Sequence, residues 1–172
     1  MSHTVNIIPG KTMSQIYDLD EDLKKGCEEA VTYGNNIYVF GRHGSGKTSV
    51  LKYFYDMAPK FFGVDRSEVL FMKACDFIDK MIFSIRNGEE REFKYEIKSA
   101  QVIILDDIDR FANKDATLCE FRDILEMNKK IIISGVDDAR SLPLPEMIRN
   151  KILGFTNMEI DECYDGISGI DE

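Results

Sequence analysis

The run GRHGSGKT at residues 41–48, directly after the apolar segment IYVF at residues 37–40, most constrains what this chain can fold into. A buried strand does not ordinarily continue into glycine at three of the next six positions. Glycine permits backbone conformations with positive φ, so the chain can curl tightly and its N–H groups can converge on one point. The pattern therefore predicts a strand, a tight loop and a following helix, an arrangement typical of α/β proteins.

Residues 41–48 match G-x-x-x-x-G-K-[ST], the pattern of a phosphate-binding P-loop. Backbone N–H groups and the positive end of the following helix can hold a triphosphate. Lys47 can reach the β- and γ-phosphates, and the Thr48 hydroxyl can ligate Mg²⁺. The expected cofactors are ATP or ADP with Mg²⁺, and the expected cofactor-binding residues are Gly41, Gly44, Ser45, Gly46, Lys47 and Thr48.

A second acidic site is expected where the segment VIILDD ends a buried strand at residues 102–107. P-loop nucleotide hydrolysis needs a carboxylate beside the Mg²⁺ shell. Asp106 is predicted to serve the metal, together with Thr48. Asp107 is predicted to polarise the attacking water, which makes Asp107 and Lys47 the predicted catalytic pair.

Strands and helices alternate along the chain, which predicts a three-layer P-loop fold with a five-stranded parallel sheet. We divide the chain into an irregular lead-in and helix (1–33), the core (34–160) and an acidic tail (161–172). The predicted strands cover residues 37–40, 69–72, 102–105, 131–133 and 156–160. The predicted helices cover residues 18–32, 48–57, 76–85, 89–98 and 118–127, with the second ending before Pro59.

Composition limits the range of functions. The 172 residues carry a net charge of -9, so the chain lacks a strong global attraction for nucleic acid. No apolar run approaches the ~20 residues of a membrane span. The start MSHTVNIIPGK shows no apolar signal-peptide segment, and the four cysteines show no CxxC spacing. We expect a cytoplasmic protein with no membrane partner.

Several segments resemble the replication initiator DnaA over residues 34–160. QVIILDDIDRFANKD is similar to its Walker B segment, and KKIIISGVDDARSLP to its sensor 1 strand. PEMIRNKILGF resembles the segment that carries its arginine finger, and FIDKMIFSIRNGEEREFKYEIKSA resembles its helical insert. The resemblance implies an AAA+ ATPase of the initiator and helicase-loader group.

Three departures from that family affect the expected mechanism. The sensor 1 position falls on Val136, with Asp137 one place later. The arginine-finger position falls on Lys151, with Arg149 as the nearest arginine, and lysine matches a γ-phosphate less well than a guanidinium does. The family's lid and its C-terminal DNA-binding domain have no counterpart in the sequence. We therefore expect slow or partner-dependent hydrolysis, with Arg149 or Lys151 acting in trans.

The predicted function is an ATP-binding AAA+ protein of DNA replication that assembles with an initiator, a helicase or another AAA+ subunit. The alternative is a lid-less regulatory module that binds such a protein, and a small P-loop kinase is a third, less favoured hypothesis. The insert of the initiator family faces single-stranded DNA, so its basic residues can contact phosphates. The interleaved glutamates describe a solvated helix face equally well. The residues concerned are Lys80, Arg86, Arg91 and Lys94.

Overall fold

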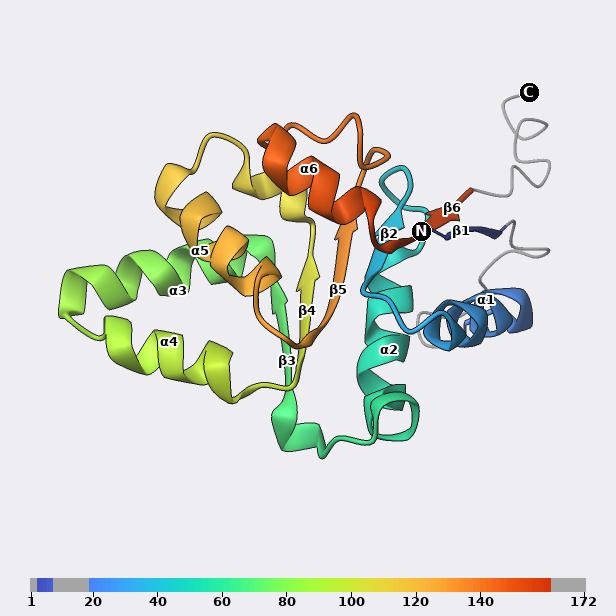
Figure 1. Ribbon diagram of the computed structural model, residues 1–172, viewed down its shortest axis with the longest axis horizontal. Helices are drawn as coiled ribbons and strands as arrows, with labels where there is room; N and C mark the ends of the chain where they lie inside the picture. The colour runs from blue at the N-terminus through green and yellow to red at the C-terminus, as the bar shows by residue number, and fades with distance from the viewer. Residues whose placement is uncertain (1–2, 8–18, 162–172) are drawn as a thin grey trace, which may run out of the picture.

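The computed structural model of the protein describes residues 3–7 and 19–161. These residues form three layers, with α1 and α2 on one face of a sheet and α3 to α6 on the other (Figure 1). In chain order the elements are β1 (Thr4–Ile7), α1 (Glu21–Thr32), β2 (Ile37–Phe40), α2 (Lys47–Phe62), β3 (Val69–Lys73), α3 (Ala74–Asn87), α4 (Glu90–Ser99), β4 (Val102–Asp106), α5 (Asp115–Leu125), β5 (Lys130–Gly135), α6 (Glu146–Leu153) and β6 (Thr156–Ile160).

The strands of the described chain form one parallel sheet in the order β1-β6-β2-β5-β4-β3. The parallel α/β prediction is confirmed, but the sheet has six strands where five were predicted. The additional strand is β1, in the segment predicted to be irregular. It pairs with β6, so that Val5 lies opposite Met158 and is buried. The pairing partner is about 150 residues away along the chain, and no local pattern in the sequence reports it.

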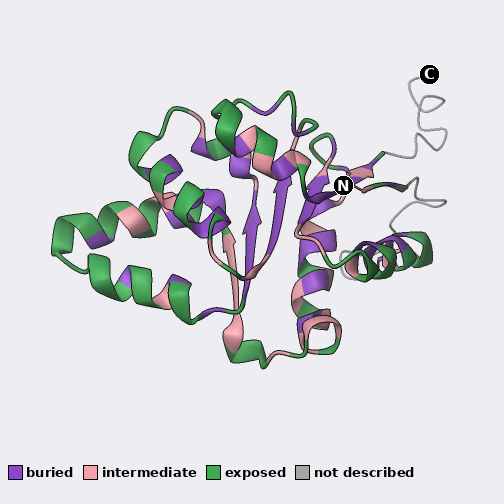
Figure 2. Cartoon of the chain, in the orientation of Figure 1, coloured by how far each residue is buried: buried purple, intermediate pink, exposed green. Residues whose placement is uncertain are grey.

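Strand β4 explains why the sequence shows an unbroken apolar run. All five of its residues are buried, because helices cover both faces of the sheet (Figure 2). Ile103 and Leu105 pack into the core under α3 to α6, whereas Val102 and Ile104 pack into the core under α1 and α2. The register with β5 brings the carboxyl ends of the two strands together. The candidate nucleotide site lies at this edge of the sheet.

The predicted end of α2 is wrong, since the helix continues through Pro59 to Phe62. Proline lacks the N–H that would bond the carbonyl four residues earlier, so it usually ends a helix. Here Phe61 and Phe62 pack against the core and compensate for the missing bond. Gly63 closes the helix with φ 65° and an N–H bond to the Pro59 carbonyl.

Other helix predictions also differ from the structure, and the clearest cases are α6 and α5. The short helix α6 is absent from the predicted elements, and it begins directly after Pro145. Helix α5 begins three residues before its predicted start, at Asp115. Residues 8–18, predicted to hold most of the irregular lead-in and the start of the first helix, lie outside the described residues, as does the acidic tail beyond Asp161. Among those that are described, no helix has the length and apolar character that crossing a bilayer requires.

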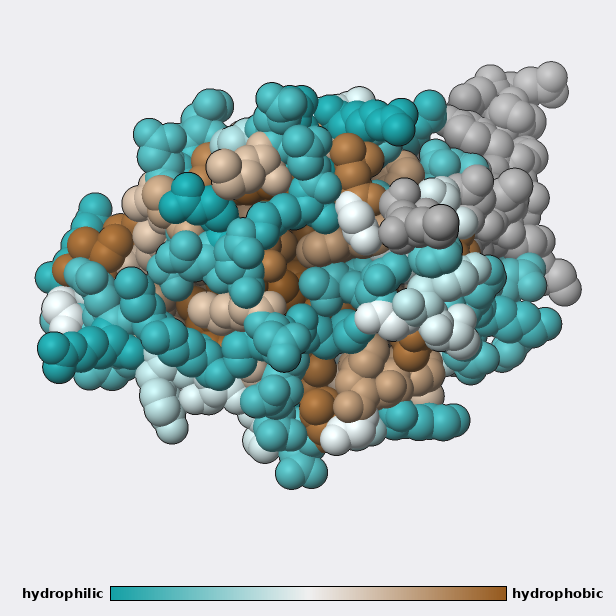
Figure 3. All heavy atoms as spheres, viewed as in Figure 1, coloured by the Kyte–Doolittle hydropathy of each residue, from teal (hydrophilic) through white to brown (hydrophobic). Residues whose placement is uncertain are grey.

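Helices α3 and α4 form a hairpin that projects from the body (Figure 1). Phe77 and Phe93 pack edge to face at 5.2 Å between ring centroids and hold the two helices together. Large apolar side chains are exposed on both helices of the hairpin, including Phe83 at 58% on α3 and Tyr95 at 74% on α4. Figure 3 shows a largely hydrophilic surface with hydrophobic atoms at this projecting end.

Candidate nucleotide site

The loop between β2 and α2 has the conformation that its glycines were predicted to permit. Gly44 and Gly46 adopt φ values of 81° and 99°, in the left-handed region that other residues rarely enter. Gly41 is required for space instead, because a Cβ atom there would lie 2.5 Å from the Ile160 carbonyl oxygen. The loop therefore curls between β6 and the start of α2.

The ammonium group of Lys47 lies inside this curl. It donates hydrogen bonds to the carbonyl oxygens of Gly41 at 2.5 Å and Arg42 at 2.9 Å. The Ser45 hydroxyl is also buried, and among the described residues it has no hydrogen-bond partner. A buried polar atom without a partner is costly, so its presence inside the loop fits a site that binds a polar ligand such as phosphate.

Asp106 lies at the end of β4, where two hydroxyl groups hold its buried carboxylate. Thr48 Oγ1 donates to Oδ2 at 2.8 Å, and Ser134 Oγ donates to Oδ1 at 2.5 Å. Thr48 lies in the first turn of α2 and Ser134 lies in β5, so three elements position one carboxylate. Hydroxyl and carboxylate oxygens are the ligands that Mg²⁺ prefers. Asp106 and Thr48, both predicted metal ligands, are thus brought together.

The next residue, Asp107, has an unusual backbone. Its φ of 62° and ψ of 54° lie in the left-handed region, which aspartate enters more readily than most residues. Its N–H donates to Ser134 Oγ at 2.9 Å, which fixes this turn to β5. Non-glycine residues in this region store strain and concentrate at functional sites.

Burial raises the pKa of the Asp107 carboxyl, and the neighbouring carboxylates of Asp106 and Asp109 raise it further. The positive groups of Lys47 and His43 act in the opposite direction. A carboxyl with a raised pKa is a better proton acceptor than an ordinary aspartate, which suits a general base. The predicted role of Asp107 is compatible with this environment.

The residues present fit Mg²⁺ with a nucleotide rather than a metal held by protein alone. The described part of the chain contains no group of three or more histidine, cysteine, aspartate and glutamate side chains able to hold a metal ion. Mg²⁺ commonly binds through one or two protein ligands plus substrate phosphates. Thr48 and Asp106 supply such a set beside the loop that contains Ser45 and Lys47.

Two residues near the site were missed by the sequence analysis. The resemblance directs attention to Val136 and Asp137 for sensor 1, but the β5 side chain that contacts Asp106 is Ser134, two residues earlier. Tyr38 is fully buried in β2, and its hydroxyl donates to the Asp137 carbonyl oxygen at 2.5 Å. A polar residue within the apolar run IIIS was the available signal for Ser134, whereas Tyr38 reads as an ordinary core residue.

The two residues expected to act in trans differ in their surroundings. The Lys151 ammonium forms an ion pair with Glu126 Oε1 at the end of α5. Arg149 donates from Nη1 to the Arg140 carbonyl oxygen at 3.1 Å and has no ion pair among the described residues. Of the two, Arg149 has the positive charge that no carboxylate of the described chain neutralises.

The four basic residues of the insert also fall into two groups. Lys80 pairs with Glu96 at 2.5 Å, and Lys94 lies 4.0 Å from Glu120. Arg86 and Arg91 are exposed and form no ion pair within the described segments. Only these two arginines therefore have a guanidinium group available for a phosphate without breaking an internal pair.

The parallel sheet order, the glycine loop after β2 and the paired acids after β4 define a P-loop fold of the AAA+ type. The family model for the bacterial DnaA ATPase domain matches residues 6–151, so the chain belongs to this family. The chromosomal replication initiator protein DnaA of Aquifex aeolicus (strain VF5) is 28% identical over 134 residues, which cover 76% of this chain and 32% of that protein.

Solved structures agree with this assignment. A replication initiator DnaA bound to AMPPCP and single-stranded DNA matches with a TM-score of 0.70 at 26% identity, over 81% of this chain and 44% of that one. The DnaC helicase loader matches with a TM-score of 0.62 at 17% identity, over 81% and 85% of the two chains, and shows the fold alone. The chain spans about a third of the Aquifex aeolicus relative.

Proposed function

We propose that the protein is an AAA+ module of DNA replication that binds ATP with Mg²⁺ and assembles with another AAA+ subunit according to its nucleotide state. The observation that carries this proposal is the 2.8 Å bond between Thr48 and Asp106. It joins the two halves of a Mg²⁺-nucleotide site across residues that are 58 apart in the sequence. The neighbouring unpartnered Ser45 hydroxyl supports it.

Each residue has a distinct task in this proposal. Lys47 exchanges its bonds to the Gly41 and Arg42 carbonyls for bonds to phosphate oxygens. Thr48 and Asp106 would hold Mg²⁺, which would neutralise charge that develops on the phosphates. Asp107 orients a water molecule and accepts its proton. Ser134 keeps Asp106 and the Asp107 turn in register with each other.

We propose that hydrolysis is slow in the isolated chain and faster in an assembly. An arginine supplied by a neighbouring subunit contributes ~10³–10⁵ in rate by stabilising transition-state charge. Arg149 follows β5 and has no carboxylate partner within the described residues, so it is the residue of this chain best suited to act on another subunit's nucleotide. Lys151 is less suited because it is engaged with Glu126.

Calorimetric titration with Mg²⁺ and AMPPCP tests the binding site. We expect measurable affinity in the unchanged protein and none in Lys47→Ala, which removes the charge that neutralises phosphate. Lys60→Ala, an exposed change in the same helix, is the matched control and should bind like the parent. Unchanged affinity in Lys47→Ala would contradict the proposed phosphate site.

A second candidate function is a regulatory module that docks on an initiator or helicase without turning over ATP. The net charge of -9 and the ion pair that engages Lys151 favour it. Hydrolysis measured with a purified AAA+ initiator separates the two functions. ATP hydrolysis that is stimulated in the mixture and requires Arg149 supports the ATPase module. Tight association with no ATP hydrolysis in either subunit supports the regulatory module.

A further inference from the structure

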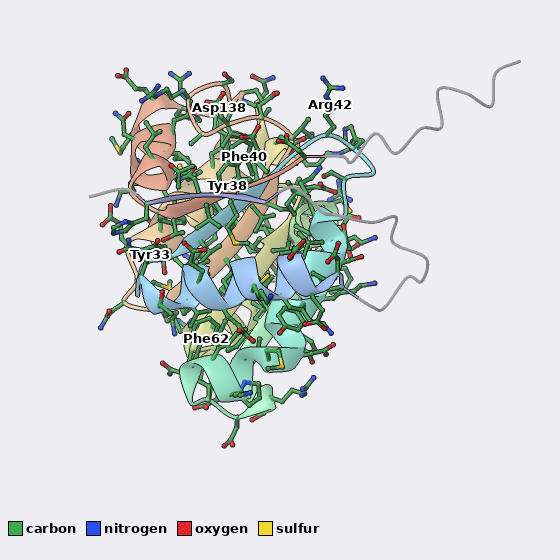
Figure 4. The ribbon with its side chains drawn as sticks, turned by 90° about the vertical axis from the view of Figure 1, so that its right-hand side faces the viewer. Tyr33, Tyr38, Phe40, Arg42, Phe62 and Asp138 are labelled. Atoms are coloured by element: carbon green, nitrogen blue, oxygen red, sulfur yellow. The ribbon has the colours of Figure 1, made fainter. Side chains whose placement is uncertain are left out.

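Tyr38 makes an unusual contact for a core residue. Its side chain is completely buried, yet its hydroxyl leaves the core of β2 to bond the Asp137 carbonyl oxygen, 99 residues away in sequence, at 2.5 Å. Figure 4 shows Tyr38 and Phe40 on β2 and Asp138 beyond them, at the same end of the molecule as Arg42 of the phosphate loop. A phenylalanine would fill the same core space, so the hydroxyl has a role beyond packing.

The path of the hydroxyl depends on Gly135. A Cβ atom at this position would lie 2.3 Å from Tyr38 Oη and 3.1 Å from Leu142 Cδ2. The glycine therefore lets the tyrosine cross the end of β5 and reach the loop that follows. Gly135 also accepts a hydrogen bond from the Gly41 N–H at 3.3 Å, so the same residue contacts the start of the phosphate loop.

The loop that Tyr38 holds is a compact turn. Asp138 Oδ1 accepts from the N–H groups of Arg140 at 2.8 Å and Ser141 at 3.3 Å, and the Ser141 N–H bonds the Asp138 carbonyl at 3.0 Å. At the top of this turn, the Arg140 carbonyl oxygen accepts from Arg149 Nη1. Arg149 is thus attached to a turn whose first residue, Asp137, is bonded to the phosphate-loop strand.

We propose that the Tyr38 hydroxyl is a positioning group that fixes the turn at residues 137–141 and, through it, sets Arg149 in response to nucleotide at the phosphate loop. The inference rests on the proposed function and names the internal link between its two halves. The element with two states is Lys47, which bonds the Gly41 carbonyl in this structure and phosphates in the proposed complex. When Lys47 releases that carbonyl, Gly41 can shift, and its N–H bond to the Gly135 carbonyl passes the shift to Gly135. Tyr38 crosses Gly135 and would move with it.

The hydroxyl is suited to a permanent link. Burial raises the pKa of Tyr38, and the carboxylates of Asp109, Asp137 and Asp138 raise it further, so the group stays protonated and remains a donor. Within the described part of the chain the hydroxyl donates to the Asp137 carbonyl oxygen, and the side chain of Asp137 itself is exposed. Replacement by phenylalanine therefore removes the link while retaining the buried ring.

Nitrogen-15 NMR of the whole chain tests this link, with Mg²⁺ and AMPPCP as the probe. The Arg149 Nε–Hε signal is assigned by its loss in Arg149→Lys. We expect it to shift on addition of the probe in the parent protein and to stay unmoved in Tyr38→Phe, while the nucleotide Kd changes by less than about threefold. Tyr33→Phe removes an exposed hydroxyl that bonds Glu29 and should leave the shift intact.

The remaining outcomes are separable. If Tyr38→Phe does not fold, Asp138→Ala decides, because it loosens the turn without altering the core and should also abolish the Arg149 shift. The inference alone is overturned if the Arg149 signal shifts in Tyr38→Phe and Asp138→Ala as much as in the parent. It is also overturned if that signal stays still in the parent while the phosphate-loop amides move. Phosphate-loop amides that do not respond in the parent overturn the proposed function, and this inference with it.

Discussion

The Ser134 hydroxyl lies 2.5 Å from Asp106 Oδ1 and donates its hydrogen bond to that oxygen. The same hydroxyl accepts from the Asp107 N–H at 2.9 Å. One serine in β5 therefore orients a proposed metal ligand and holds the strained turn that presents the proposed general base. Loss of a group that orients a metal ligand typically lowers metal affinity by about 10- to 100-fold.

Ser134→Ala should weaken the Mg²⁺-dependent part of nucleotide affinity by about 10- to 100-fold. The change leaves Asp106 with one hydroxyl partner and the Asp107 N–H without its acceptor. Titration of AMPPCP with and without Mg²⁺ measures the effect. Ser84→Ala, which removes a buried hydroxyl from α3, is the control. Equal affinities in the two variants would show that Ser134 only packs.

Asp107→Asn should retain nucleotide binding and lower hydrolysis by about 10²–10⁴-fold, the usual contribution of a general base. Asp106→Asn should instead weaken Mg²⁺-nucleotide binding, because it removes a charged ligand. The raised pKa of Asp107 also predicts that hydrolysis falls, on the acidic side, at a higher pH than an ordinary aspartate would give. Equal loss of binding in both variants would mean that the two roles are merged.

The same carboxyl should make the ligand-free protein less stable at neutral pH. Its pKa is raised in the folded state, so its contribution is favourable below the ordinary aspartate pKa and is lost as the pH rises through the folded value. Asp107→Asn should therefore have a higher Tm than the parent at pH 7. Well below the ordinary aspartate pKa of about 4, where the carboxyl is protonated in both states, the two Tm values should converge. A lower Tm at pH 7 would contradict this electrostatic account.

Gly135→Ala should destabilise the protein by about 1–3 kcal/mol, the usual effect of overpacking. The new methyl group would overlap Tyr38 Oη, the closest atom to it. In the Tyr38→Phe background the same alanine should be less harmful, since that oxygen is gone. Urea unfolding of the two single variants and the double variant measures the coupling. Tyr33→Phe combined with Gly135→Ala should be additive, because Tyr33 lies away from Gly135 on the helix α1 side.

If single-stranded DNA binds the insert, the affinity should depend on Arg86 and Arg91 rather than on the lysines. Arg86→Gln and Arg91→Gln should each lower the salt dependence of oligo-dT binding by about 0.7, the value for one phosphate contact on a single strand. Lys80→Gln should have little effect because Glu96 already pairs with that ammonium. Fluorescence anisotropy at several salt concentrations measures these slopes. Identical slopes in all three variants would exclude the insert as a DNA-contacting surface.

The sequence by itself determined the features that depend on consecutive residues. Gly44 and Gly46 permit positive φ, and their spacing from Lys47 and Thr48 defines a phosphate loop without knowledge of any other segment. Likewise, the run of apolar residues before Asp106 indicates a strand buried on both faces, and the alternation of strands with helices indicates a parallel sheet. These signals are local because each depends on the conformation or burial of one short segment.

Only the tertiary structure decided which distant residues meet. The edge strand β1, the contact of Ser134 with Asp106, the bond from Tyr38 to Asp137 and the pairing of Lys151 with Glu126 all join segments that are far apart in sequence. The first three depend on strand order and register, since a shift of one residue would turn every side chain of a strand to the other face, and the last depends on how α5 and α6 pack. The sequence near either residue does not indicate such a contact, because the partner depends on how the whole sheet and its helices pack.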